Sequence, residues 1–539
     1  MNSKYLLFSV IGLAAASLTG CYEMDTLPLD QYLTDQQKVE AKENNPEMAQ
    51  ASITGITGLF STYNTNFSDE THSDFGIAAD MLNSDCRGID MVNPIIGYNW
   101  FLQAGRMSDC SPTSNATVMI WGNSYKQIFA ANAALTALPE GSEDPTLQFY
   151  QAQAYAMRAY DYFILAQTYQ FTYKGNEQKP CVMLITEKNQ NDAALNGAPR
   201  ATVQAVYDQI ISDLNKAVDL LTSSGVKPEQ VLSSKPKRFV SLATAYGLRA
   251  RVNLVMNNWE AAADDAQAAI DNFSGRPLSL AGASVPGFNT LDASNWMWGI
   301  AIAPTDRVVT SGIVNFPSHM GSLNYGYATV GAYRALSKKV YEAIPETDVR
   351  KGWFTNAEGI SANLNAEQQA YVSDWAVDAE KNVIPYIQVK FAPYQDIVGN
   401  SENASDIMLM RVEEMYYILA EATAMNGGDG ASILTAFVSG YRDPSYSFAG
   451  SGEAVQEECW NQRRVEFFGE GLATFDLMRL KKPFDRRGAG WAKDYVYNIA
   501  PDDPVLLYPI PETEVNGNKL FTTGENNPSA SMPKPVADI

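Results

Sequence analysis

The sequence predicts a mostly α-helical protein, in which tetratricopeptide-like helical pairs support an irregular, loop-rich second region with a few short strands. Residues 238–271 carry the strongest sign of this fold: two apolar stripes at helical spacing, separated by an Asn-Asn pair typical of a turn. Small residues dominate both stripes, which lets the two helix axes approach closely. Similar stripes recur before and after this hairpin, whereas residues 272–400 are rich in Pro, Gly, Asn and Ser and follow no single period.

The N-terminal end has the features of a lipoprotein leader. Residues 1–20 contain one lysine followed by an apolar run that is too short to cross a bilayer. The Leu-Thr-Gly-Cys ending resembles a bacterial lipobox, which implies cleavage before Cys21 and lipidation of that cysteine. Residues 21–46 are then expected to be a lipidated tether. A plain secretory signal that happens to contain a cysteine is the alternative.

Residues 47–539 are expected to form a single body. We assign its helical-repeat scaffold to about 47–271 and 405–481, and an irregular region that faces a ligand to about 272–404. The proline-rich end, residues 482–539, is expected to lie across the body as a strap.

The expected elements follow from hydrophobic periodicity along the chain. Residues 65–116 carry glycines, prolines and aromatic residues without a lasting period, which is typical of a long functional loop. Alternating apolar residues predict a strand at 296–302. The expected helices cover residues 47–64, 117–138, 147–169, 203–221, 238–271 as a pair, 333–344, 406–425, 432–439 and 455–468.

The net charge of −22 argues against nucleic acid and anionic lipid surfaces as partners. The chain has only two histidines and no C-x-x-C spacing, so we expect no metal site. No phosphate-binding glycine motif and no G-x-S-x-G elbow is present, so we expect no cofactor and no nucleophilic triad. An exported chain can form disulfides, but the sequence leaves open whether Cys86, Cys110, Cys181 and Cys459 are paired or are free buried thiols.

An acidic cluster near residue 466 raises the possibility of a glycosidase, since two carboxylates about 5–9 Å apart can cleave a glycosidic bond. The acids are Glu466, Glu470 and Asp476, and the arginines at neighbouring helical steps are Arg463, Arg464 and Arg479. Carboxylates paired with arginines have low pKa values and make poor general acids. We therefore expect structural ion pairs here and no enzymatic activity.

Five stretches in the chain, together with the lipobox, resemble motifs of the SusD/RagB family of outer-membrane nutrient-binding lipoproteins. They are AQAYAMRAYDYFILAQTY (152–169), the 238–271 hairpin, LMRVEEMYYILAEA (409–422), QRRVEFFGEGLATFDLMRLKKP (462–483) and LLYPIPETEVNGN (506–518). Their order is that of the family, and together they extend over nearly the whole chain.

The resemblance implies a non-catalytic protein on the outer membrane, lipid-anchored and facing the cell exterior. It implies capture of an oligosaccharide or polysaccharide and its delivery to a TonB-dependent, SusC-like transporter. Some relatives handle peptides, so a peptide ligand stays open. A surface glycosidase and a helical-repeat scaffold that binds only protein are the alternatives.

A sugar offers an apolar face that a flat aromatic ring can cover and a fringe of hydroxyls that polar side chains can bond. Aromatic residues in irregular loops on a rigid scaffold fit this chemistry. Two regions qualify, residues 87–101 and 296–327. The candidate ligand-binding residues are Arg87, Asp90, Tyr98, Asn99, Trp100, Trp296, His319, Tyr325 and Tyr327. Trp100 fits ligand contact or the core equally well, whereas the strand position of Trp296 favours the core.

Overall fold

The computed structural model describes residues 35–44, 47–68 and 71–539. The predicted signal peptide, Cys21 and much of the predicted tether lie outside the described residues. Within the predicted tether, Asp35–Asn44 forms helix α2. In the described part of the chain, no helix combines the length and the hydropathy that crossing a bilayer requires.

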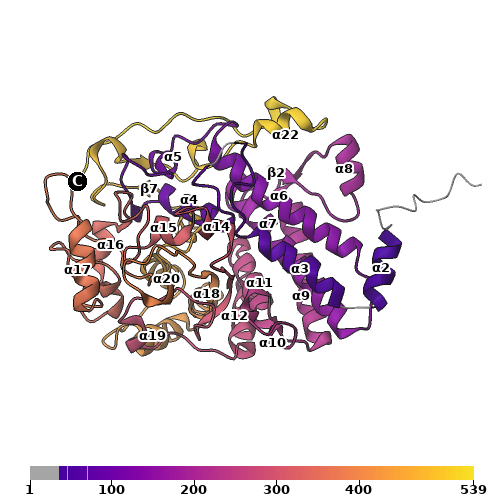
Figure 1. Ribbon diagram of the computed structural model, residues 1–539, viewed down its shortest axis with the longest axis horizontal. Coiled ribbons are helices and arrows are strands. Elements are labelled where there is room, and N and C mark those ends of the chain that lie inside the picture. The colour runs from indigo at the N-terminus through magenta and orange to yellow at the C-terminus, as the bar shows by residue number, and fades with distance from the viewer. Residues whose placement is uncertain (1–34, 45–46, 69–70) are drawn as a thin grey trace, which may run out of the picture.

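The predicted mostly helical class is confirmed, and the strands of the described residues form short two-stranded sheets. Figure 1 shows the long helices packed side by side, with the C-terminal segment crossing one edge of the molecule. The scaffold helices are α3 (Glu47–Leu59), α6 (Asn115–Thr136), α7 (Pro145–Tyr169), α9 (Val203–Ser224), α11 (Leu242–Met256), α12 (Trp259–Asn272), α18 (Val412–Met425), α19 (Gly430–Tyr441), α20 (Glu453–Glu466) and α21 (Ala473–Arg479).

The long helices begin where side chains can cap their free backbone N–H groups. The Asp144 carboxylate accepts from the N–H groups of Thr146 and Leu147 at 2.8 and 3.0 Å, and Pro145 supplies the preset φ of a first helical residue. The Thr202 hydroxyl similarly caps α9, which ends at Gly225 in a left-handed conformation. These local signals explain why the predicted helix bounds in this half agree with the structure within a few residues.

The hairpin formed by α11 and α12 has the predicted turn, because Asn257 takes a left-handed φ of 61° and ends α11. One of its small residues, Gly247, has a different close neighbour from the predicted one. A Cβ atom on Gly247 would lie 2.6 Å from the Met410 sulfur and 3.0 Å from that of Met415. The glycine therefore makes room for the 410–415 segment rather than for the other helix of the hairpin.

The sheet between β4 (Trp296–Ile300) and β6 (Ile407–Arg411) joins the irregular region to the scaffold. The two strands run antiparallel, and every residue of both is buried. The predicted strand at 296–302 is confirmed. The prediction of a helix from residue 406 is wrong for its first residues, because 407–411 pair with β4 before α18 begins.

The loop predicted at residues 65–116 contains two helices that the sequence pattern did not indicate, α4 (Ile77–Arg87) and α5 (Leu102–Arg106). Nine of the eleven residues of α4 are buried, polar ones included. The shorter helices elsewhere are α8 (Gln190–Asn196), α10 (Pro228–Val231), α13 (Leu280–Ala283), α14 (Arg307–Thr310), α15 (Phe316–Met320), α16 (Lys338–Ala343), α17 (Ala366–Trp375) and α22 (Glu512–Gly517).

Short antiparallel pairs hold the remaining segments together. They are β1 (Met91–Val92) with β5 (Ala335–Leu336), β2 (Pro180–Met183) with β3 (Arg200–Thr202), and β7 (Phe484–Asp485) with β8 (Asn498–Ile499). The C-terminal segment passes over the surface, where the N–H groups of Ala530 and Val536 donate to carbonyls of Cys110 and Val496. The four described cysteines are buried free thiols.

Candidate functional site

Two neighbouring loops place aromatic side chains at the surface. Tyr98 is 75% exposed, Trp100 41% and Tyr325 48%, and we call these three residues the aromatic platform. Tyr98, Asn99 and Trp100 line a hollow of about 350 Å³, which we call the platform hollow. Tyr325 lies on the adjoining loop, where the Tyr327 ring is centred 6.4 Å from that of Trp100. The structure thus brings the two predicted regions together through Trp100 and Tyr327.

A stack of rings supports Trp100 from below. Its ring lies 4.7 Å from that of His72, and His72 Nδ1 is hydrogen-bonded to the Tyr327 hydroxyl. Tyr327 is 8% exposed and stacks at 4.6 Å on the buried His319. Both histidines of the chain therefore lie under the platform. No periodic pattern marks His72 in the sequence, and only the scarcity of histidine could have drawn attention to it.

His319 is a structural member of this stack rather than a ligand contact. It is fully buried between the rings of Phe75 and Tyr327, and its Nε2 donates to the His72 carbonyl at 2.9 Å. Its Nδ1 has no hydrogen-bond partner in the described part of the chain. Burial, with the charge of Arg334 acting in the same direction, lowers the pKa of His319 to about 3.

We expect His319 to weaken the fold as the pH falls. An unfolded histidine has a pKa of about 6.5, so between that value and about 3 only the unfolded chain takes up the proton, and stability falls as the pH falls. His319 should lower the free energy of unfolding by about 2 kcal/mol between pH 7 and pH 5. The free energy of unfolding of His319→Gln, measured by chemical denaturation at pH 7 and at pH 5, should fall by less between these pH values than that of the wild type. An equal loss in both proteins would contradict this prediction.

Asn99 was predicted to bond ligand hydroxyls, but its amide is used inside the protein. The side chain donates to the Asn93 side chain and the Pro94 carbonyl at 3.0 and 2.6 Å, and accepts from the N–H of Phe101 at 3.1 Å. It is 4% exposed. Asn99 therefore fixes the turn that presents Tyr98 and Trp100.

Three other candidates lie in the interior, and we leave them out of the proposed site. Arg87 forms a buried ion pair with Asp109. Asp90 is held by Arg464 at 2.6 and 2.9 Å. Trp296 lies on β4 with no exposed surface. Each of these side chains is enclosed by the protein, so a ligand on the platform cannot reach it.

The acidic cluster forms ion pairs, as predicted, but with partly different partners. Asp476 pairs with Arg463 and Arg479 at 2.7 Å, in agreement with the prediction. Glu466 and Glu470 instead pair with cations from distant segments. These are Arg350, Arg411 and Arg442 around Glu466, and Lys390 and Arg411 around Glu470.

The electrostatics of this cluster oppose acid–base catalysis. Burial would raise the pKa of Glu466, but Arg442, Arg411 and Arg350 hold it well below its usual range. Glu466 has no exposed surface. A carboxylate that is sealed from solvent and held ionised can neither reach a substrate nor act as a general acid.

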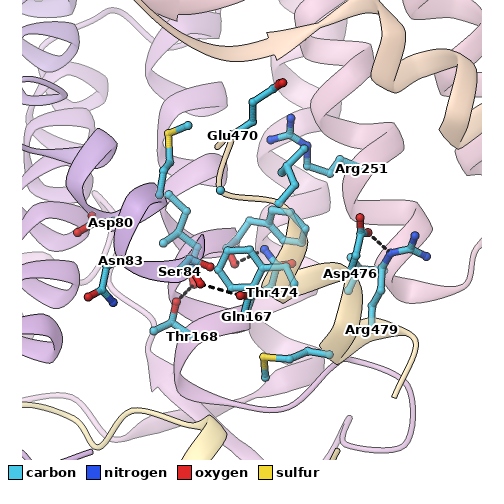
Figure 2. Close-up of a pocket in the computed structure, with 18 of the residues that line it drawn as sticks. Asp80, Asn83, Ser84, Gln167, Thr168, Arg251, Glu470, Thr474, Asp476 and Arg479 are labelled. Carbon is cyan, nitrogen blue, oxygen red and sulfur yellow. Dashed lines mark hydrogen bonds and ion pairs between the residues drawn. The ribbon is translucent and has the colours of Figure 1, made fainter. Parts of the chain in front are cut away.

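A pocket beneath α21 lies at the meeting point of the sequence stretches that carry the family resemblance. Figure 2 shows the Asp476–Arg479 pair on one side and Thr474 bonded to Ser84 below. The volume is about 90 Å³, whereas sites for small molecules usually measure about 300–1,000 Å³. We interpret it as a packing gap under α21. Among the described residues, no group of three His, Cys, Asp or Glu side chains is placed to hold a metal ion.

Comparisons with known proteins agree with this architecture. A family model described as starch-binding and associating with the outer membrane matches residues 30–254, and the model of the SusD family matches residues 337–528. The chain belongs to the SusD/RagB family. SusD-like protein P2 of Formosa agariphila is 24% identical over 437 residues, which cover 76% of this chain and 79% of that protein.

Solved SusD-like structures share the fold. A SusD-like carbohydrate-binding protein from Bacteroides vulgatus aligns over 89% of this chain and 98% of its own, with a TM-score of 0.71 and 21% identity. A surface glycan-binding protein from Bacteroides thetaiotaomicron in complex with laminarihexaose aligns over 89% and 99%, with a TM-score of 0.61 and 16% identity. SusD-family glycan-binding proteins are non-catalytic.

Proposed function

We propose that this SusD-like protein captures a neutral oligosaccharide or polysaccharide on the aromatic platform without cleaving it. The observation that carries the proposal is the position of Tyr98 and Trp100, two exposed rings beside a hollow large enough for a sugar unit. The His72–Tyr327–His319 stack holds Trp100 in place before any ligand arrives. A preformed surface loses little conformational freedom on binding, which favours affinity.

The chemistry of the platform suits an uncharged sugar. Its three side chains carry no charge, and their rings can cover the apolar faces of pyranose units. The phenol hydroxyls of Tyr98 and Tyr325 can bond the hydroxyl fringe. The relative crystallised with laminarihexaose makes laminarin the first polysaccharide to test.

Electrophoresis of the purified protein through gels containing laminarin, starch or another neutral glucan tests the proposal. Retardation by at least one of them, with no new reducing ends after incubation, is the expected result. New reducing ends that disappear in both Glu466→Gln and Glu470→Gln, in preparations shown to be folded, would favour the glycosidase. No retardation by any neutral polysaccharide would contradict the proposal.

Tyr325→Ala should weaken binding only modestly. Tyr325 is two residues from Tyr327 and does not line the platform hollow, so we expect the dissociation constant to rise only about 2–5-fold, as for the loss of roughly 0.5–1 kcal/mol of ring contact. Isothermal titration with the best glycan measures this. An affinity equal to that of the wild type would place Tyr325 outside the site.

We further propose that the protein delivers its ligand to a TonB-dependent, SusC-like transporter at the outer membrane, where lipidated Cys21 anchors it. The family description as associating with the outer membrane supports this location. Co-purification of a barrel transporter with the tagged protein is the expected result. Recovery of the transporter together with a complete lack of glycan binding would favour the protein-only scaffold.

A further inference from the structure

A second hollow runs along one side of helix α3. It consists of two cavities of about 300 and 460 Å³, and both are lined by Arg238, Ala301 and Asp306. One wall is α3 and the turn after it, and the other is formed by residues 231–238 and 299–307. We call this hollow the α3 cleft. It shares no lining residue with the platform hollow, and each cavity is large enough for a small-molecule ligand.

Arg238 lines both cavities and has no anionic partner among the described residues. Its Nε is buried without a hydrogen-bond acceptor, and none of the described carboxylates lies within ion-pair distance of its guanidinium. Burial lowers the pKa of Arg238, and no neighbouring acid opposes this. Arg238 as a whole is half-buried, whereas the fully buried Arg158 and Arg411 are paired with carboxylates. A buried donor without an acceptor calls for an explanation, and a ligand is one.

The remaining lining of the cleft is about half polar and carries two more cations, Arg307 and Lys235, of which Lys235 is paired with Asp406 at 2.6 Å. Hydroxyl groups line the α3 side; they belong to Thr54, Thr57, Ser61 and Thr62. The Arg307 guanidinium lies 5.3 Å from the centre of the Tyr63 ring. Asp306 is the acid common to both cavities, and its carboxylate accepts from the Ala303 N–H at 2.8 Å. Two arginines therefore face one acid that already has a hydrogen-bond donor.

We propose that the α3 cleft binds a carboxylate-bearing sugar unit of the uronate type, with Arg238 as the partner of the carboxylate. A guanidinium can donate two parallel hydrogen bonds to a carboxylate. The threonine and serine hydroxyls can bond the ring hydroxyls of the same unit. The net charge of −22 opposes anions at long range, but salt screens this repulsion beyond about 8 Å under physiological conditions. A local cation can therefore select one anionic unit.

The proposal can be tested on the purified protein by saturation-transfer NMR and titration calorimetry. The probe is D-glucuronate, and D-glucose is its uncharged counterpart. The wild type should bind glucuronate at least tenfold more tightly than glucose. Arg238→Gln should lose at least tenfold in glucuronate affinity, and Arg238→Lys should lose less because it keeps the charge. The matched control is Arg276→Gln, because Arg276 is an exposed arginine outside the cleft.

The site does not depend on the proposed function of the platform. Trp100→Ala should leave glucuronate binding unchanged, and Arg238→Gln should leave neutral glucan binding unchanged. Among the described residues the Arg238 side chain has no hydrogen-bond or ion-pair partner, and its guanidinium lies 5.8 Å from the centre of the Phe239 ring, so unfolding curves of Arg238→Gln should lie close to those of the wild type. Equal glucuronate affinity in Arg238→Gln and wild type would overturn the proposal. Equally tight binding of N-acetylglutamate would overturn the assignment to a sugar.

Discussion

Replacing Glu466 with glutamine should lower the free energy of unfolding by about 3–5 kcal/mol, since removing one partner from a buried ionic network leaves uncompensated charge. The Glu466 carboxylate accepts from Arg442 at 2.8 Å twice, from Arg411 at 2.6 Å and from Arg350 at 3.1 Å. Each of these guanidiniums is itself buried. Glutamine keeps the shape of the side chain but carries no negative charge, so the three guanidinium groups lose one of the carboxylates that compensate their charge.

Chemical unfolding followed by tryptophan fluorescence measures this loss. The matched control is Glu453→Gln at the start of the same helix, α20, where the side chain is exposed and the change should stay within about 0.5 kcal/mol. A loss below about 1 kcal/mol for Glu466→Gln would mean that solvent reaches the network. The assignment of Glu466 to structure rather than catalysis would then need revision.

The same network marks the limit of what the sequence predicts about the fold. Helical periodicity located the long helices, because it depends on residues only a few positions apart in the chain. The neighbouring arginines were predicted to neutralise the cluster, and this is correct for Asp476. It is wrong for Glu466, whose partners lie 55, 24 and 116 residues away in the chain. Such contacts leave no periodic signal.

The candidate site was predictable to a similar extent. Glycine-punctuated loops with aromatic residues indicated where exposed rings would lie, and Tyr98, Trp100 and Tyr325 are at the surface. Residue type alone did not separate these rings from the polar and aromatic residues that hold the loop. Asn99 was counted as a ligand residue because amides bond sugars, yet an amide satisfies a buried turn equally well. The supporting role of His72 depends on contacts between segments far apart in the sequence.

Trp100→Ala should weaken glycan binding about 30-fold or more, which corresponds to a loss of roughly 2 kcal/mol, as for other aromatic hot spots. Trp100 is the largest ring of the platform and lines the platform hollow. Its lower face rests on His72 and its edge meets Tyr327, so the ring is already oriented for contact. Alanine removes both the stacking face and the wall of the hollow. Titration calorimetry with laminarin or the best glucan measures the change.

The control for Trp100→Ala is Phe129→Ala, because Phe129 is 43% exposed, close to the 41% of Trp100, and lies on α6 outside the platform. It should keep wild-type affinity. A Trp100→Ala protein that binds every glycan as tightly as the wild type would show that the platform is not the binding surface. An intermediate loss in Tyr327→Phe, which keeps the ring but removes the hydroxyl that bonds His72, would show that affinity depends on how firmly Trp100 is held.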